Sequence, residues 1–271
     1  MVKSMQLHEK KEKLEKILDQ YDALLVAFSG GVDSTFLLYM AHAVMGENVV
    51  AVTAQSPLHP ERERQFTENF TARMHIRYKV IPSGEMQLAD FIANPKDRCY
   101  ICKKTILGDL LKIGKELGIS HVAHGANMDD LDDYRPGMKA AEELRVAAPL
   151  LEAELTKEDI RLLSKKMHLE TWDKPSMACL ATRIPYGTPI SEKALSMIDR
   201  AEEVILGLGF YTCRVRHHGV VARIELRPED ITDLLTEKTR TIIIRKLKEI
   251  GFQHVALDLE GYVTGSMNRN I

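Results

Sequence analysis

A glycine turn near the amino terminus constrains the fold of this chain more than any other feature. An apolar run from Ala23 to Phe28 leads into Ser-Gly-Gly-Val-Asp-Ser-Thr, residues 29 to 35, and apolar residues resume at Phe36. Paired glycines let the backbone approach a ligand, because no side chain blocks it and left-handed dihedral angles cost little. The following helix offers unpaired N–H groups and the positive end of its dipole. The turn therefore predicts a strand, a phosphate-binding loop and a helix in succession.

The polar side chains of the turn suit a polyphosphate with a metal ion. Ser34 and Thr35 bring hydroxyl donors, and the carboxylate of Asp33 suits a cation, which we expect to be Mg²⁺. The turn lacks the lysine of the G-x-x-x-x-G-K-[ST] loop and the third glycine of the dinucleotide fingerprint. It resembles the S-G-G-x-D-S motif of the PP-loop ATP pyrophosphatases, in which the loop holds the pyrophosphate that leaves ATP. That resemblance implies a set of ATP-binding residues: Ser29, Gly30, Gly31, Asp33, Ser34 and Thr35. The alternative is a strand-to-helix turn with a serine cap.

Apolar runs and helical patterns alternate through the first two thirds of the chain. Strands are predicted at 23–28, 48–54, 76–81 and 121–125 with a short fifth strand near 149–151, and helices at 7–19, 60–74, 103–117 and from Thr156. This alternation predicts an α/β fold with a doubly wound parallel sheet. Beyond residue 190 the pattern changes to that of a small α+β domain. We therefore expect a PP-loop domain at 1–185 and a substrate or oligomerisation domain at 186–271.

Ligands of such sheets lie beyond the carboxyl ends of the strands. Ser56 follows the second predicted strand and Gly125 ends the fourth, so both are expected to hold adenine and ribose. The polar loop from Asp129 to Gly137 lies on the same edge, where Arg135 is expected to bind a phosphate or a carboxylate. The alternative for this loop is a solvated acidic segment.

Three of the four cysteines have a spacing that points to chemistry. Cys99 and Cys102 form a C-x-x-C just before a predicted helix, and Cys179 lies in a turn-rich stretch far downstream. Three thiolates without a fourth suggest a metal centre with an open position, as in a 4Fe–4S cluster held by three cysteines. Zinc with His124 or another residue as a fourth ligand, and a redox or persulfide relay at Cys99 and Cys102 with Cys179 unrelated, remain alternatives.

Cys179 has a second candidate role. Arg183 lies nearby in the sequence and would favour the thiolate, which attacks electrophiles such as an acyl adenylate. A buried core cysteine is the alternative.

A predicted strand at 212–218 alternates charged and apolar side chains. Arg214 and Arg216 fall on one face, and Cys213 falls on the other as an expected core residue. Two arginines at this spacing suit a phosphate or a carboxylate, with Arg223 and Glu225 of the next strand as neighbours. The alternative is a solvated charged face.

These stretches together resemble the ATP-dependent sulfur transferases of the LarE family, which belong to the nickel-pincer nucleotide pathway that supplies lactate racemase. The resemblance is carried by the following segments: 27–35, 133–137, 179–187, 214–216, 222–226 and 257–261. It implies adenylation of a carboxylate on a pyridinium dicarboxylate mononucleotide, followed by displacement of AMP by sulfur. It also implies roles for single residues: Cys179 as the sulfur donor, Lys103 in the active site, and Arg183, Arg214, Arg216 and Glu225 at the substrate or its phosphate.

The resemblance also divides the family by its cysteines. Members with one cysteine sacrifice it and retain dehydroalanine. This chain adds Cys99 and Cys102 to Cys179 and so resembles the three-cysteine form, for which a 4Fe–4S cluster carrying an extra sulfide is implied. We therefore expect ATP, Mg²⁺ and a 4Fe–4S cluster as cofactors, and sulfide or another sulfur donor as a partner.

Composition narrows the remaining possibilities. The formal net charge of the 271-residue chain is -2, which gives no chain-wide attraction to nucleic acid. No apolar run is long enough to span a bilayer and no signal-peptide core is present, so we expect a cytoplasmic protein. Family resemblance implies a homo-oligomer. The other functions considered are tRNA thiolation around a similar cluster, amide formation, and ATP binding without catalysis.

Overall fold

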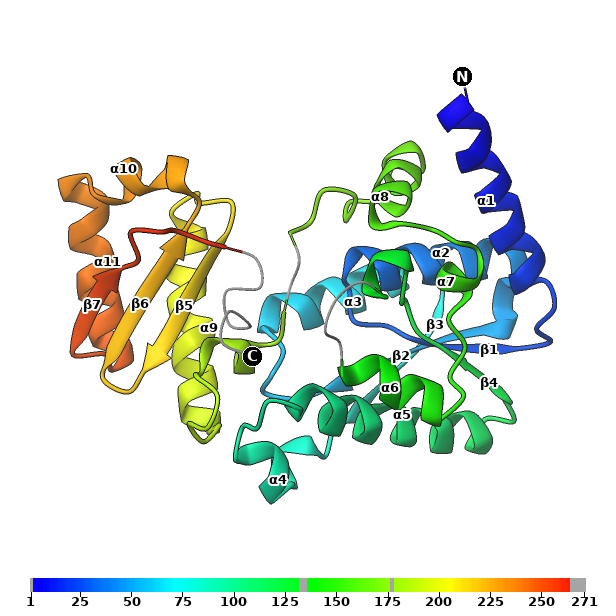
Figure 1. Cartoon of the computed structure of the whole chain (residues 1–271), viewed down its shortest axis with the longest axis horizontal. Helices are drawn as coiled ribbons and strands as arrows, with labels where there is room; N and C mark the ends of the chain where they lie inside the picture. The colour runs from blue at the N-terminus through cyan, green and yellow to red at the C-terminus, as the bar shows by residue number, and fades with distance from the viewer. Residues whose placement is uncertain (1, 132–135, 176–177, 264–271) are drawn as a thin grey trace. The chain divides into compact units, whose positions relative to one another are not determined.

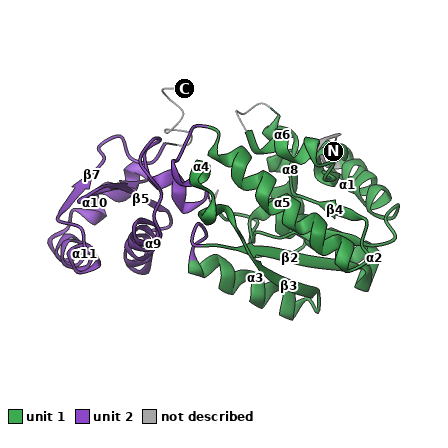
Figure 2. Cartoon of the chain, turned by 90° about the horizontal axis from the view of Figure 1, so that it is seen from below, with its two compact units in different colours: residues 1–56, 61–91, 97–177 green, residues 57–60, 92–96, 178–271 purple. Residues whose placement is uncertain are grey.

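The computed structural model describes residues 2–131, 136–175 and 178–263 and contains two compact units (Figure 2). Unit 1 comprises residues 1–56, 61–91 and 97–177, and unit 2 comprises 57–60, 92–96 and 178–271. Residues 92–96 belong to unit 2 because Asn94 anchors them there. Its side-chain amide donates to the carbonyls of Pro185 at 2.8 Å and Thr188 at 2.9 Å. The functional domain ranges 1–185 and 186–271 remain a proposal.

Unit 1 is built on a four-stranded parallel sheet of order β3-β2-β1-β4 (Figure 1). Its strands are β1 (Leu24–Ala27), β2 (Val49–Gln55), β3 (Arg77–Pro82) and β4 (His121–Ala123). The register pairs Leu24 with Val49 on one side and with His121 on the other. The central position of β1 places the turn that follows it between two neighbouring strand ends.

Helices cover both faces of this sheet. Successive strand residues point to opposite faces, so each face packs in its own core cluster. Leu24 and Val26 pack in one core cluster, and Leu25 packs in another. The first cluster includes residues of α1 (Val2–Leu18), α2 (Val32–Met45), α3 (Glu61–Arg73) and α8 (Lys157–Lys166). The second includes residues of α5 (Arg98–Glu116) and α6 (Pro136–Glu143). The predicted α/β fold with a doubly wound parallel sheet is confirmed.

The short fifth strand expected near 149–151 is reduced to a single parallel bridge. Ala147 forms an isolated parallel bridge with Ala123, and the chain then enters the short helix α7 (Pro149–Glu152). Pro149 supplies the reason, because it has no N–H for a ladder and its fixed φ suits the first position of a helix. The remaining short elements of the chain are η1 (Gly46–Asn48), η2 (Glu85–Gln87), α4 (Ala89–Ile92), η3 (Met128–Asp130), η4 (Leu180–Arg183) and η5 (Pro228–Asp230).

Unit 2 contains a three-stranded sheet of order β5-β6-β7. The strands β5 (Cys213–His218) and β6 (Val221–Leu226) are antiparallel, and β7 (His254–Leu257) runs parallel to β6. Residues of α9 (Glu192–Gly207), α10 (Ile231–Leu234) and α11 (Glu237–Ile250) pack with the sheet in one core cluster. Cys213 is 1 % exposed in this core, which confirms the prediction for that cysteine. The expected smaller α+β part of the chain is present.

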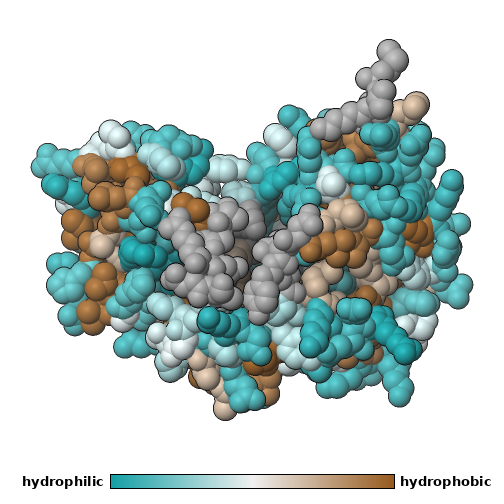
Figure 3. All heavy atoms as spheres, in the orientation of Figure 1, coloured by the Kyte–Doolittle hydropathy of each residue, from teal (hydrophilic) through white to brown (hydrophobic). Residues whose placement is uncertain are grey.

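The surface of the described residues is mixed in character. On the face shown in Figure 3, hydrophobic residues form separate patches between hydrophilic ones. Within residues 2–131, 136–175 and 178–263, no helix has the length and apolar character that a membrane crossing requires.

Candidate functional site

The glycine turn forms a preorganised loop between β1 and α2. The hydroxyls of Ser29 and Ser34 lie 3.1 Å apart, and Ser34 Oγ donates to the carbonyl of Gly31 at 3.2 Å. Gly31 is the N-cap of α2, and Gly30 has a φ of 74°. A Cβ on Gly30 would lie 3.0 Å from side-chain atoms of Phe66 and Thr67 on α3. The space around Gly30 and its backbone angles therefore both require glycine at this position. Thr35 is completely buried in the first turns of α2.

The segment after β4 approaches the same loop. A Cβ on Gly125 would lie 2.9 Å from the backbone nitrogen of Ser34 and 3.0 Å from the carbonyl carbon of Asp33. Ser56 directly follows the last residue of β2 and is buried. The structure thus brings Gly125 against the loop and places Ser56 at the carboxyl edge of the sheet. Arg135 lies outside the described residues.

Lys157 is a residue at the loop that the sequence analysis missed. Its Nζ lies 2.5 Å from Oδ2 of Asp33, and its backbone N–H donates to Asp129 Oδ2 at 2.7 Å. It is the first residue of α8, whose amino terminus is closed by a capping box between Thr156 and Asp159. The sequence predicts the polar cap before Lys157. It does not predict that Lys157 pairs with Asp33, which lies 124 positions away.

Lys174 is a second missed residue at the loop. Its Nζ donates to the carbonyl of Gly30 at 3.0 Å and to Glu63 Oε2 at 2.6 Å, and it lies 4.4 Å from the ring centroid of Phe66. Glu63 is 7 % exposed. No motif considered in the sequence points to Lys174, which lies in a turn-rich stretch 144 residues from Gly30.

Two neighbouring basic side chains, Lys103 and His124, have pKa values below their ordinary range. Burial lowers the pKa of Lys103, with the charges of Cys102 and Asp130 acting in the opposite direction. Burial, and then the charge of Lys103, lower the pKa of His124 to about 3. His124 is therefore a neutral imidazole at neutral pH. Gly137 of α6 packs close by, since a Cβ there would lie 3.4 Å from Cβ of Lys103.

The cysteine pair lies inside a helix rather than before it. The helix α5 begins at Arg98, so Cys99 and Cys102 occupy its first turns, one exposed and one half-buried. Cys179, half-buried, belongs to unit 2. Thiolates are the ligands of an iron–sulfur cluster, but the described residues contain no group of three or more His, Cys, Asp or Glu side chains that would hold a metal ion.

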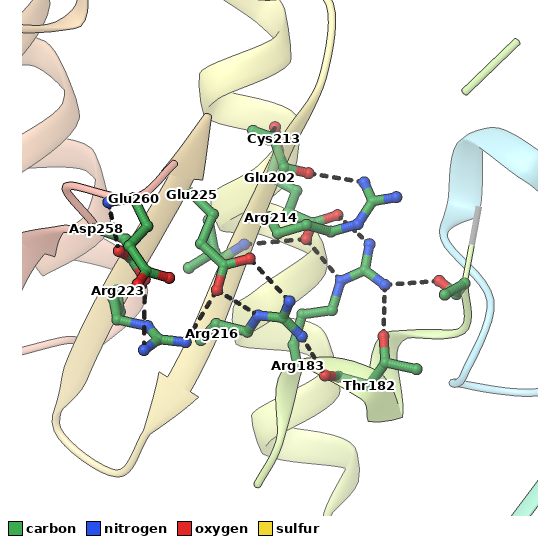
Figure 4. Close-up of polar contacts among 12 residues, drawn as sticks. Thr182, Arg183, Glu202, Cys213, Arg214, Arg216, Arg223, Glu225, Asp258 and Glu260 are labelled. Carbon is green, nitrogen blue, oxygen red and sulfur yellow. Dashed lines mark hydrogen bonds and ion pairs between the residues drawn. The ribbon is translucent and has the colours of Figure 1, made fainter. Parts of the chain in front are cut away.

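Arg183 is buried and fully engaged with protein groups in unit 2 (Figure 4). Its Nε and Nη2 donate to the two carboxylate oxygens of Glu202 at 2.8 and 3.1 Å, and its Nη1 donates to the carbonyls of Ala178 and Cys179 at 2.7 and 3.2 Å. Burial opposes the charge of Glu202, but Arg183 holds the pKa of that carboxyl below its ordinary value. Arg183 therefore fixes the backbone that carries Cys179.

A second buried pair lies on the sheet of unit 2. Arg216 donates from Nε and Nη2 to both oxygens of Glu225 at 2.8 Å, and from Nη1 to the carbonyl of Thr182 at 2.6 Å (Figure 4). Arg223 donates to the same carboxylate at 2.9 Å. The predicted proximity of Arg223 and Glu225 to Arg216 is confirmed, because Arg223 is the register partner of Arg216.

Arg214 occupies the neighbouring position on β5 and is 4 % exposed. Burial, and then the charge of Arg183, lower the pKa of Arg214, while Glu202 acts in the opposite direction. Its guanidinium carbon lies 5.1 Å from the ring centroid of Tyr262. Arg214 is thus a buried cation that faces a second cation, and an anion bound beside it would relieve that repulsion.

The parallel sheet and its glycine loop define the chain as a PP-loop ATP pyrophosphatase. The family profile described as NAD synthase matches residues 7–97. The chain is 35% identical over 269 residues to the pyridinium-3,5-bisthiocarboxylic acid mononucleotide synthase of Lactiplantibacillus plantarum, covering 97% of this chain and 95% of that protein. The chain belongs to the LarE family of ATP-dependent sulfurtransferases.

Two further relatives extend over most of the chain. Protein slr1717 of Synechocystis is 38% identical over 263 residues, covering 97% of this chain and 98% of that protein. Protein MJ0830 of Methanocaldococcus jannaschii is 29% identical over 239 residues, covering 88% and 90%. The similarity therefore includes both compact units.

Proposed function

We propose that the chain converts a carboxylate of a pyridinium dicarboxylate mononucleotide into a thiocarboxylate. A carboxylate oxygen attacks the α-phosphorus of ATP, and pyrophosphate leaves with the electrons of the broken P–O bond. Sulfur then attacks the acyl carbon, and AMP leaves with the former carboxylate oxygen. The name of the L. plantarum relative, which covers almost the whole chain, supports this substrate class.

The preorganised loop from Ser29 to Thr35 is the observation that carries the proposal. A helix amino terminus with a glycine loop in front of it stabilises a polyphosphate by its N–H groups and its dipole. The carboxylate of Asp33 would hold Mg²⁺, which neutralises charge on the phosphates. Lys157, which lies at Asp33, would supply a further cation at this position. Ser56 and Gly125 would contact the nucleoside.

Lys103 is proposed to bind the anionic substrate. Its lowered pKa follows mainly from burial, and an anion placed beside it favours the protonated form. Arg214 and Arg216 are proposed to hold a phosphate of the substrate or nucleotide, with Glu225 orienting Arg216. Arg183 is proposed to serve the same phosphate through its charge, since its donors already bind protein groups. Arg135 is proposed as an ATP-binding residue on family resemblance.

Cys179 is proposed as the site of sulfur delivery. Arg183 donates to the carbonyl of Cys179 at 3.2 Å, and thiolates displace AMP from acyl adenylates. On family resemblance, the sulfur comes either from Cys179, whose Cβ–S bond breaks as a base takes the Cα proton and dehydroalanine is left, or from a 4Fe–4S cluster that Cys99, Cys102 and Cys179 would hold and that sulfide or another donor would recharge. A homo-oligomer is proposed on the same ground, and the expected cytoplasmic location stays a prediction.

A single-turnover reaction tests the proposal. Protein purified without oxygen is mixed with ATP, Mg²⁺ and the dicarboxylate mononucleotide, and pyrophosphate, AMP and the mass of the product are measured. We expect one pyrophosphate and one AMP for each oxygen replaced by sulfur. Iron and acid-labile sulfide, measured also in Cys99→Ala and Cys179→Ala, distinguish the two sulfur sources. Pyrophosphate release without sulfur in the product would refute sulfur transfer.

A further inference from the structure

The carbonyl group of Gly30 has an ammonium partner that the proposed function does not use. Lys174 Nζ donates to this carbonyl at 3.0 Å and is held there by Glu63, a buried carboxylate 2.6 Å away. In a trans peptide the C=O and the next N–H point in opposite directions. Fixing the Gly30 carbonyl toward Lys174 therefore directs the N–H of Gly31 away from Lys174, as a donor of the phosphate loop.

Lys174 also lies in a segment whose backbone is hydrogen-bonded to α8. We call residues 172–175, the last described part of unit 1, the connector. Arg161 of α8 donates from Nη1 to the carbonyl of Trp172 at 2.8 Å and from Nη2 to the carbonyl of Lys174 at 2.7 Å. The same helix begins with Lys157, which pairs with Asp33 of the loop. Loop, connector and α8 are thus joined in a closed ring of contacts.

We infer that Lys174 is a positioning residue of the phosphate loop, which orients the peptide between Gly30 and Gly31 toward pyrophosphate and couples its binding to the connector. An ammonium on the carbonyl also increases the polarity of that peptide, which strengthens the hydrogen bond donated by Gly31. The inference rests on the proposed use of the loop for the pyrophosphate of ATP.

Coupling of this kind is reciprocal. If the contact between Lys174 and Gly30 favours binding of pyrophosphate, bound pyrophosphate must stabilise the same contact and therefore the connector. The chain offers a direct probe of this effect, because its single tryptophan, Trp172, lies in the connector. Bound pyrophosphate should reduce the quenching of Trp172 fluorescence by acrylamide.

The test is titration of the full chain with inorganic pyrophosphate and Mg²⁺, and separately with AMP, by calorimetry. Lys174→Met removes the charge and the donor, including the cation beside the Phe66 ring, and keeps an unbranched side chain of similar length. We expect this variant to bind pyrophosphate about tenfold more weakly, as for loss of one charge-assisted hydrogen bond, and to bind AMP within about twofold of wild type. A misfolded loop would lose both ligands, so AMP distinguishes positioning from structural damage.

Two variants serve as controls. Lys174→Arg keeps a cationic donor and should retain pyrophosphate affinity within about threefold of wild type. Lys165→Met removes a cation 4.1 Å from the ring centroid of Trp172 and should leave pyrophosphate affinity unchanged. Protection of Trp172 from acrylamide by pyrophosphate should occur in wild type and in Lys174→Arg, and should be absent from Lys174→Met.

Unchanged pyrophosphate affinity in Lys174→Met, or an equal loss of AMP affinity, would overturn the inference. It would also be overturned if wild type bound no pyrophosphate. The proposed function fails separately, if pyrophosphate binds as expected but ATP and substrate give no thiocarboxylate.

Discussion

The phosphate loop of unit 1 and the arginine cluster of unit 2, defined as Arg183, Arg214, Arg216 and Arg223 with their carboxylate partners, are built in opposite ways. Glycines and backbone groups shape the loop, so that Gly30 and Gly125 leave no room for a Cβ. Buried side chains make most of the cluster, in which Arg183 and Glu202 are both completely buried, whereas the side chain of Arg223 is 40 % exposed. The loop is therefore sensitive to added volume, and the cluster is sensitive to removed charge.

Arg183→Met tests the cluster and should have the largest effect on stability. The variant leaves the carboxylate of Glu202 buried without its bidentate partner. Loss of one member of a buried ion pair typically costs about 3–5 kcal/mol, and we expect the free energy of unfolding to fall by this amount in urea denaturation. Arg200→Met, on an exposed position of the same α9 that carries Glu202, is the matched control. A loss below about 1 kcal/mol would show that the pair is dispensable.

Gly125→Ala tests the loop by adding one methyl group. The new Cβ would lie 2.9 Å from the nitrogen of Ser34, and backbone atoms cannot move aside as a flexible side chain does. We expect destabilisation of about 1–3 kcal/mol, together with weaker ATP binding measured by calorimetry. Gly108→Ala is the control, since nothing lies within 4 Å of its added Cβ in the middle of α5, and it should stabilise the chain by about 0.5–1 kcal/mol. Equal effects at the two positions would contradict the comparison.

Acidification should lower the free energy of unfolding of unit 1, because His124 becomes protonated. The pKa of His124 is about 3 in the folded chain, below the ordinary 6.5, so the unfolded chain binds the proton more tightly. Stability from this group is complete above pH 6.5 and falls by about 1.4 kcal/mol for each pH unit below it. Urea denaturation of wild type and His124→Gln between pH 7.5 and 4.5 measures the difference. Parallel pH profiles for the two proteins would disprove the assignment to His124.

An exposed charge network gives a reference for the buried ion pairs, because it should contribute least to the stability of the fold. Tyr100 Oη donates to Glu143 Oε2 at 2.7 Å and accepts from Lys104 Nζ at 2.6 Å, joining α5 to α6. Exposed pairs gain little in water. Tyr100→Phe should lower Tm by about 1 °C in calorimetry. A decrease above about 4 °C would place this surface network in the class of the buried pairs.

The sequence predicted those parts of the fold that local pattern determines. The glycine turn predicted the loop between β1 and α2, and alternation along β5 predicted the core position of Cys213. The expected fifth strand is reduced to the bridge between Ala147 and Ala123, because Pro149 favours a helix start over a ladder position. The helix carrying Cys99 and Cys102 begins earlier than predicted, at Arg98.

The contacts that complete the candidate site were not accessible from local pattern. Lys157 and Lys174 reach the loop from residues 124 and 144 positions away, and nothing in their own segments specifies the partner. The carboxylate partner of Arg183 is Glu202, which lies on the helix α9, 19 positions further along the chain. Tertiary packing fixes such pairs, and a single sequence does not encode them as a motif.

Backbone groups of the described segment around Cys179 make hydrogen bonds, and three of its peptide oxygens accept from arginines. Arg183 binds the carbonyls of Ala178 and Cys179, and Arg216 binds that of Thr182. These anchors are the same whatever atom replaces the thiol. Under the proposed sulfur transfer, the segment would therefore keep the contacts of its peptide oxygens after the sulfur has left.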